Sequence, residues 1–265
     1  MCRYKSKFEM ADDQNKFIAS NEKSCKIIKK EMVLEVLRKD KGSDAILKSF
    51  NLIDFTKKGD NYSCFVTSIV AEYMIEGKVS SAKYIAKMNP KRGFAAGDGF
   101  TAIQFKQENK FYAEILPELN QVLQENHQES LRVPEFYYYS DEAGDEIMIF
   151  EDMRERGFKM FDKLKGCDQL HAELMFKELG RLHAAGKLLI ERYGEKEAIA
   201  KFTLLEDIMS ASEDNDMTDK YFVSMMITAS KLAKNLGQKY HRAAQVSLAL
   251  SQVRICRPPL TLHQF

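Results

Sequence analysis

The spacing of apolar residues changes along the first part of the chain. Over residues 24–39 they recur every three or four positions, which predicts a helix. Alternating and β-branched runs then predict three antiparallel strands near Ser49–Phe55, Phe65–Ile75 and Val79–Met88, with a turn at Glu76-Gly77 between the last two. This part of the chain therefore combines one helix with an antiparallel sheet.

A second helical pattern, over residues 102–116, follows a glycine-containing loop at residues 93–99. We expect Pro117 to interrupt or bend this helix, because proline lacks the N–H group that a helix interior needs. Residues 133–139 and 146–153 flank a turn and predict a second hairpin. The pattern so far predicts a five-stranded antiparallel sheet crossed by one long helix.

Beyond residue 166 the pattern becomes wholly helical. Asp168 can cap a helix whose apolar side carries Leu174, Leu179 and Leu182. The predicted fold class is α+β. The predicted parts are an N-terminal extension and helix (1–44), a lobe of sheet and helix (45–153), a partial helical lobe (154–253) and an unstructured tail (254–265).

Composition narrows the function classes. Forty basic and 39 acidic residues leave a net charge of +1, so no general field favours nucleic acid or an anionic membrane. The five cysteines are scattered without metal-ligand spacing, which is typical of a protein in a reducing compartment. The charged N-terminus and the absence of a long apolar run predict a cytoplasmic protein.

Lys87 and Glu108 are the first candidates for chemistry. The period of two places Ile85 on the same side of the strand as Lys87, and Glu108 lies between Phe105 and Tyr112 on the sheet-facing side of the helix. A carboxylate shielded there without a cation would be costly, so we expect an ion pair. The lysine would then reach nucleotide phosphates, and Ile85 would contact the adenine. The alternative is that both charges lie at margins and are solvated.

The segment Gly59-Asp60-Asn61-Tyr62-Ser63 joins the first two predicted strands. Backbone N–H groups and a hydroxyl in such a segment can bind phosphate. Glycine followed by Asp-Asn is also ordinary turn chemistry. Its position, a plausible hairpin length before the lysine strand, is the reason to assign it to nucleotide binding.

Glu151-Asp152-Met153 follows an apolar strand, where the chain is expected to leave the sheet. Backbone groups at such a point are free to bind the edge of an adenine, Glu151 through its C=O and Met153 through its N–H. The alternative is an acidic connector between strand and helix. The candidate nucleotide site thus comprises backbone and side-chain groups from four separate stretches of the chain.

Six short segments occur along the chain in an order and at a spacing that are specific as a set. They are Gly59–Ser63, Ile85–Pro90, Phe105–Pro117, Val133-Pro134, Ile149–Phe158 and Leu179–Ala184. The set resembles the ecdysteroid kinase-like family, a branch of the choline kinase and aminoglycoside phosphotransferase fold. The resemblance covers residues from about 45 to about 190, and more loosely to about 250.

The resemblance implies a protein kinase-like fold, with a five-stranded N-lobe followed here by an incomplete helical C-lobe. It also implies ATP, magnesium, a small-molecule acceptor such as a steroid alcohol, and a catalytic His-Gly-Asp followed by an Asn and an Asp-Phe. The chain departs from this pattern, because none of its histidines is followed two residues later by Asp. We therefore expect weak ATP binding, no magnesium held by this chain, no catalytic residues and negligible kinase activity.

Three explanations of this departure stay open. The sequence can be an incomplete kinase, from a truncated gene model or an alternative transcript. It can be a non-catalytic protein that binds nucleotide or another ligand, or an interaction module. Without the catalytic segment, the apolar side of the helix that carries Leu174 is left partly bare, so we also predict self-association through that side.

Overall fold

The computed structural model describes residues 23–55, 64–90, 95–162, 165–202 and 224–232. The chain divides into two compact units, residues 1–189 and 190–265. Each candidate site residue that the structure describes belongs to the first unit. Across the described ranges, no helix is both long enough and apolar enough to cross a bilayer.

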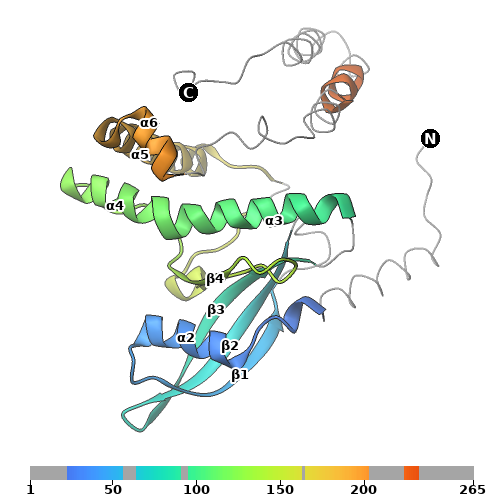
Figure 1. Cartoon of the computed structure of the whole chain (residues 1–265), viewed down its shortest axis with the longest axis vertical. Helices are drawn as coiled ribbons and strands as arrows, with labels where there is room; N and C mark the ends of the chain where they lie inside the picture. Colours follow the sequence, from blue (N-terminus) through green and yellow to red (C-terminus); the bar gives the residue numbers. More distant parts are fainter. Residues whose placement is uncertain (1–22, 56–63, 91–94, 163–164, 203–223, 233–265) are drawn as a thin grey trace, which may run out of the picture. The chain divides into compact units, whose positions relative to one another are not determined.

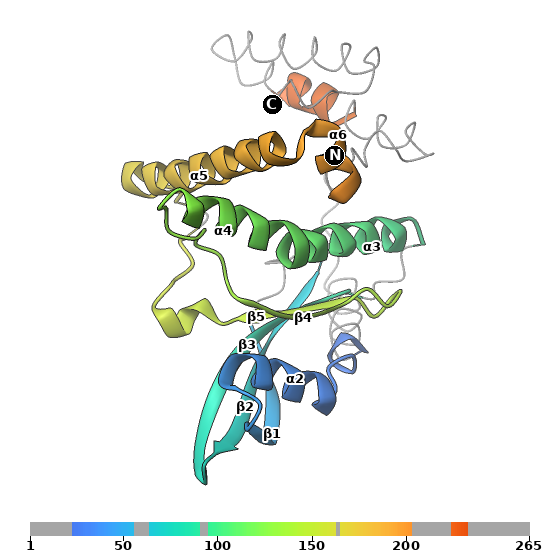
Figure 2. The same ribbon diagram turned by 60° about the vertical axis from the view of Figure 1, so that its left-hand side comes forward.

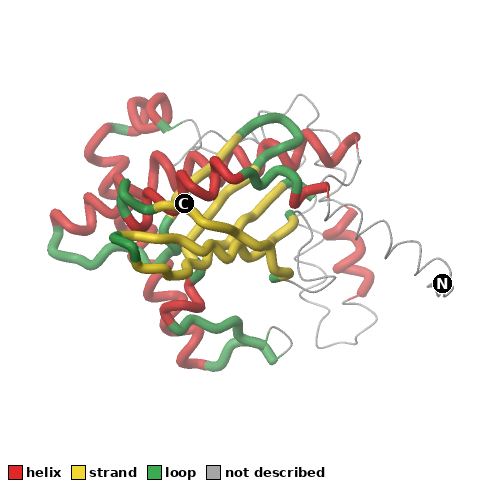
Figure 3. Tube along the Cα trace, turned by 90° about the horizontal axis from the view of Figure 1, so that it is seen from below, coloured by secondary structure: helices red, strands yellow, loops and turns green. Residues whose placement is uncertain are grey.

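Five antiparallel strands form one sheet in the order β1-β2-β3-β5-β4, and Figure 3 shows them side by side. They are β1 (Ile46–Asp54), β2 (Phe65–Ile75), β3 (Lys78–Met88), β4 (Phe136–Ser140) and β5 (Ile147–Glu151). Between β2 and β3 the positive φ angles of Glu76 (50°) and Gly77 (77°) form the tight turn that the sequence predicts. The α+β class and the five-stranded sheet are confirmed.

Helix α2 (Lys30–Lys41) covers one face of the sheet (Figure 2). Its buried residues Val33, Val36 and Leu37 pack against strand residues that include Ile69, Tyr84, Ala86, Ile147 and Ile149. All five strand residues are at most 1% exposed. Burial of each of the three isoleucine side chains contributes about 1.5–3 kcal/mol, so this face contains the main apolar core.

A polar contact lies at the edge of that core. The carboxylate of Asp40, near the end of α2, accepts hydrogen bonds from the hydroxyls of Tyr84 (2.8 Å) and Tyr137 (3.2 Å). Burial, and then the neighbouring Asp40, raise the pKa of both tyrosines above the ordinary value. The contact connects α2 to β3 and β4.

Three consecutive segments form one long rod over the other face: α3 (Ala95–Lys110), a π-helical turn (Phe111–Ile115) and α4 (Leu116–Glu125) (Figure 1). In the π-helical turn the Leu116 N–H donates to the carbonyl of Phe111, five residues earlier. Pro117 follows in the first turn of α4, where the missing N–H is tolerated. Regular α-helical bonding is thus interrupted close to the predicted place, but over Phe111–Ile115 and not at Pro117 itself.

Other predicted boundaries differ as well, among them the start of the first helix (Lys30, not residue 24) and of β1 (Ile46, not Ser49). Helix α3 begins at Ala95, so Gly97 and Gly99 lie in the helix and not in a loop. Glycine lowers helix propensity by about 1 kcal/mol but does not forbid a helix. Strand β4 begins only at Phe136, and Met153 begins a short 3₁₀ helix, η2 (Met153–Arg156), instead of ending a strand.

Helix α5 (Gln169–Tyr193) begins at the predicted cap, where the Asp168 carboxylate accepts the His171 N–H at 2.9 Å. Large apolar side chains on this helix are exposed: Leu170, Leu174, Met175, Phe176, Leu179 and Leu188. The predicted bare side is thus present around Leu174 and Leu179 in the part of the chain that is described. In the second unit, α6 (Glu195–Lys201) is followed by Phe202, whose ring lies 5.8 Å from that of Tyr193.

Candidate functional site

The ammonium group of Lys87, on β3, forms an ion pair with the carboxylate of Glu108, on α3. The two side chains are 25% and 34% exposed, so the pair is partly shielded from water. Lys87 also lies 5.7 Å from the centre of the Phe105 ring, one turn earlier on the same helix. The ion pair predicted from the sequence is confirmed.

The alternation of β3 explains this placement. Even-numbered residues such as Tyr84 and Ala86 face the α2 core, so Ile85 and Lys87 face α3. In the strand register, Lys87 lies between Val66 of β2 and Met148 of β5. An inner strand therefore presents one cation to the helix that crosses it.

Ile85 lies in a mostly apolar setting, two residues before Lys87. Its register partners are Ser68 on β2 and Phe150 on β5. Together with Tyr112 of the π-helical turn and Phe136 of β4, it packs in a second, smaller apolar cluster on this face. The Tyr112 pKa is raised, by burial first and by the charge of Glu108 second. The surface beside Lys87 is thus suited to a flat, apolar ring.

Glu151 ends β5 and is held by the chain that precedes β4. Its N–H donates to the Glu135 carbonyl (2.9 Å), and its carboxylate accepts the Glu135 N–H (3.2 Å) and a bond from Arg156 (3.2 Å). Met153, the first residue of η2, has no helical partner for its own N–H. Its carbonyl accepts the Phe158 N–H at 3.2 Å.

The five candidate residues Gly59, Asp60, Asn61, Tyr62 and Ser63 lie outside the described residues. Among the described candidates, Ile85, Lys87 and Glu108 lie together on one face of the sheet. Glu151 and Met153 lie at the end of the adjoining strand.

Two comparisons with known proteins, one against curated proteins and one against solved structures, give no match. A third comparison, against family models, matches residues 58–255 to the model described as the ecdysteroid kinase-like family. The chain belongs to the ecdysteroid kinase-like family. The antiparallel sheet crossed by a helix, with further helices after it, is consistent with the kinase-like fold of this family.

Family membership gives the site its chemical context. The ecdysteroid kinase-like family consists of kinase-like small-molecule phosphotransferases, and ATP use follows from that class. In kinases a strand lysine binds the phosphates of ATP, and a helix glutamate holds this lysine in place. Lys87 and Glu108 occupy a strand and a helix in this relation.

Four residues beside the site were not predicted from the sequence. The guanidinium of Arg154, on η2, forms a double hydrogen bond with the Asp152 carboxylate: Nε to Oδ1 at 2.8 Å and Nη2 to Oδ2 at 2.5 Å. Nη2 also lies 3.3 Å from the Ser68 hydroxyl, and the guanidinium carbon lies 4.5 Å from the centre of the Phe55 ring. The one available sequence clue is the Asp-x-Arg spacing directly after a strand.

The Asp152 carboxylate is almost fully buried, because its side chain is only 1% exposed. Burial raises its pKa, but the hydrogen bonds and the charge of Arg154 outweigh burial, so the net pKa is lowered. The hydrogen bond to Asp152 raises the Arg154 pKa in turn. Asp152 therefore stays ionised beside the strand end that carries the candidate base-binding groups.

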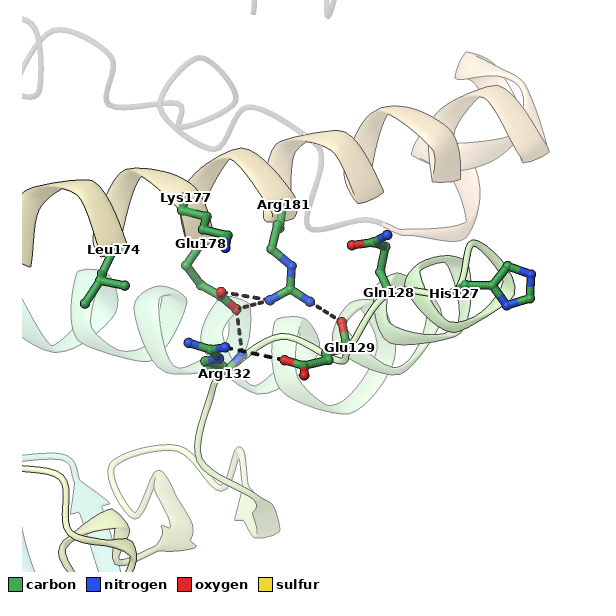
Figure 4. Close-up of a pocket in the computed structure, with 8 residues that line it drawn as sticks. All are labelled: His127, Gln128, Glu129, Arg132, Leu174, Lys177, Glu178 and Arg181. Atoms are coloured by element: carbon green, nitrogen blue, oxygen red, sulfur yellow. Dashed lines mark hydrogen bonds and ion pairs between the residues drawn. The ribbon is translucent and has the colours of Figure 1, made fainter.

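A separate pocket of about 370 Å³ lies between α5 and the chain that follows α4 (Figure 4). In it the Glu178 carboxylate accepts the Arg132 N–H at 2.7 Å and a bond from Arg181 at 2.8 Å. Burial raises the Glu178 pKa, but these bonds and charges lower it overall. Arg181 also donates to the Glu129 carbonyl, so the cluster connects α5 to the chain after α4.

Among the described residues, no group of three His, Cys, Asp or Glu side chains is arranged to hold a metal ion. The sequence contains no His-Gly-Asp, the motif that the resemblance led us to expect. The histidines after residue 190, His241 and His263, lie outside the described residues.

Proposed function

We propose that this chain binds ATP on the α3 face of its sheet and does not, by itself, transfer phosphate to an acceptor. One observation carries the proposal: an ion pair joins Lys87 of an inner strand to Glu108 of the crossing helix. A lysine fixed in this way presents its charge at one place, where it can neutralise the α- and β-phosphates.

The base would occupy the surface beside this ion pair. Ile85 provides an apolar contact on the same face of β3. The Glu151 carbonyl and the Met153 N–H would then bind the polar edge of the adenine, because Met153 begins a helix that cannot use its N–H internally. Phosphate contacts from Gly59–Ser63 are the remaining part of the proposed site.

Transfer would need groups that the printed sequence lacks. A positioned base accelerates such reactions by about 10²–10⁴-fold, and most of the remaining catalysis comes from positioning and from metal ions. The sequence has no His-x-Asp to supply the base. We therefore propose that these 265 residues hold no magnesium of their own and have negligible kinase activity. For a member of this family that does transfer phosphate, we propose a small hydroxylated molecule as the acceptor.

Calorimetric titration of ATP into the purified 265-residue protein tests the proposal. We expect weak but measurable binding, and loss of at least about tenfold in affinity for Lys87→Met, since a bond to a charged group contributes about 1.5–3 kcal/mol. Lys39→Met is the matched control, because Lys39 also forms an ion pair (3.0 Å, with Glu35) but lies on α2. Equal affinity of the wild type and Lys87→Met for ATP would refute the proposed site.

A coupled assay for ADP release, with a panel of steroid alcohols and choline, tests the second half of the proposal. The expected result is no turnover above a protein-free blank, with or without added magnesium. Turnover at the rates usual for kinases, about 1–100 s⁻¹, would contradict it.

An interaction module is the second candidate function, because Met175 and Leu179, one turn apart on the same side of α5, are 53% and 42% exposed. In this alternative the protein self-associates through α5. Sedimentation of the wild type and of the double variant Met175→Ser/Leu179→Ser distinguishes the two. A concentration-dependent oligomer that the double variant abolishes, in a protein without ATP affinity, would favour the alternative.

A further inference from the structure

Arg154 connects three parts of the first unit that are distant in sequence. Its guanidinium contacts Asp152 at the end of β5, Ser68 in the middle of β2, and Phe55 just after β1. Ser68 and Arg154 are 86 residues apart in the chain.

The position of these contacts relates them to the proposed base-binding surface. Ser68 is the register partner of Ile85, so the guanidinium lies next to the residue assigned to the adenine. Asp152 is the residue between Glu151 and Met153, whose backbone groups are assigned to the base edge. The Asp152 carboxylate also accepts the backbone N–H of Arg154 (3.1 Å), which fixes the first turn of η2.

We propose that Arg154 is a positioning residue for nucleotide binding: it holds the β5–η2 connection against β2 and Phe55, and so places the base-binding backbone groups opposite Ile85. This inference rests on the proposed ATP site. Arg154 is suited to this role because the planar guanidinium binds a carboxylate through two parallel bonds and stacks on an aromatic ring at the same time.

A structural role alone would predict something different. Asp152 is almost fully buried, so removal of Arg154 leaves a carboxylate with little compensation and destabilises the protein. That loss should disappear when Asp152 is neutralised as well. Placement of the backbone, by contrast, depends on the contacts with Ser68 and Phe55, and neutralising Asp152 does not restore them.

The test combines the variants Arg154→Gln and Asp152→Asn/Arg154→Gln with three probes: ATP, adenosine and inorganic tripolyphosphate. We expect Arg154→Gln to bind ATP and adenosine about tenfold more weakly, and tripolyphosphate as the wild type does, because the base contacts alone are misplaced. The double variant should regain the melting temperature of the wild type but not its affinity for ATP or adenosine.

Arg132→Gln is the matched control. Arg132 also forms an ion pair, with Glu129 at 3.4 Å, but it lines the separate pocket beside α5 and not the proposed base-binding surface. We expect this variant to bind all three probes as the wild type does.

Two outcomes would overturn the inference while the proposed site stands: unchanged adenosine and ATP affinity in Arg154→Gln, or recovery of affinity together with melting temperature in the double variant. In both cases Lys87→Met would still weaken ATP binding. If the wild type binds neither ATP nor adenosine, the proposed function and this inference both fail.

Discussion

The two faces of the sheet are built from alternate residues of the same strands, yet they differ in chemistry. On the α2 side, Ile69, Ile147 and Ile149 are fully buried, and the polar contacts of Asp40 lie at the edge. On the α3 side, Lys87 and Asp152 lie among apolar residues and are compensated by Glu108 and Arg154. The comparison suggests that one face stabilises the lobe and the other presents charge to a ligand.

The largest effect on stability is expected from a comparison of two isoleucines on neighbouring strands, one on each face of the sheet. Ile69→Ala removes a fully buried side chain from the α2 core and should lower the free energy of unfolding by about 2–5 kcal/mol. Ile85→Ala, on the partly buried α3 face, should cost less but weaken ATP binding. Urea unfolding and ATP titration of both variants provide the measurement. This assignment of the two faces would be wrong if the folded Ile69→Ala variant lost ATP affinity as strongly as Ile85→Ala.

The Asp40 contact gives a second, intermediate effect. Its carboxylate accepts two tyrosine hydroxyls, and hydrogen bonds to a charged group contribute about 1.5–3 kcal/mol. Asp40→Asn should therefore lower the unfolding free energy by about 1–2 kcal/mol at pH 8 without change in ATP affinity. A loss of affinity at unchanged stability would contradict the assignment of this contact to structure.

The raised pKa values of Tyr84 and Tyr137 also predict that the folded protein loses stability at alkaline pH. In the unfolded chain these tyrosines ionise near pH 10, whereas in the folded protein they stay neutral to higher pH. Their contribution to stability is thus complete below about pH 10 and is lost as the pH rises further. Unfolding midpoints should fall above that pH, and the fall should be smaller in Tyr84→Phe/Tyr137→Phe. An equal fall in this variant would exclude the two tyrosines as its cause.

The smallest expected change in stability belongs to the α3 face. Glu108→Gln removes one partner of a pair that is 25–34% exposed, where solvent screening limits the contribution to about 1 kcal/mol or less. ATP affinity should nevertheless fall, because the freed lysine is no longer held towards the phosphates. A large loss of stability with unchanged affinity would assign the pair to the core instead.

Much of this arrangement follows from local sequence patterns. The period of two in β3 separates Ile85 and Lys87 from Tyr84 and Ala86, and the helical period brings Glu108 to the sheet. Both patterns act within a few residues, so they can be recognised without a structure. The sheet and the Lys87–Glu108 pair were predictable for this reason.

The contacts of Arg154 could not be predicted in the same way. They join residues that are far apart in the chain, and a charged residue after a strand is more often solvated. The start of η2 at Met153 depends on the Asp152 side chain, which accepts the Arg154 N–H and caps the turn. This cap is local, whereas the contacts of the Arg154 side chain with Ser68 and Phe55 are tertiary, and no periodic pattern reports them.

The π-helical turn at Phe111–Ile115 separates the helix that carries Glu108 from the helix whose buried residues include Leu119 and Val122. Each residue of an α-helix turns the chain by about 100°, so the wider turn changes the rotational phase between the two halves. If the same residues adopted regular α-helical bonding throughout, the two halves would rotate relative to each other by about 100°, and either the carboxylate would turn away from its cation or the α4 residues away from theirs. A single local irregularity therefore sets the angular relation between the charged end and the apolar end of this rod.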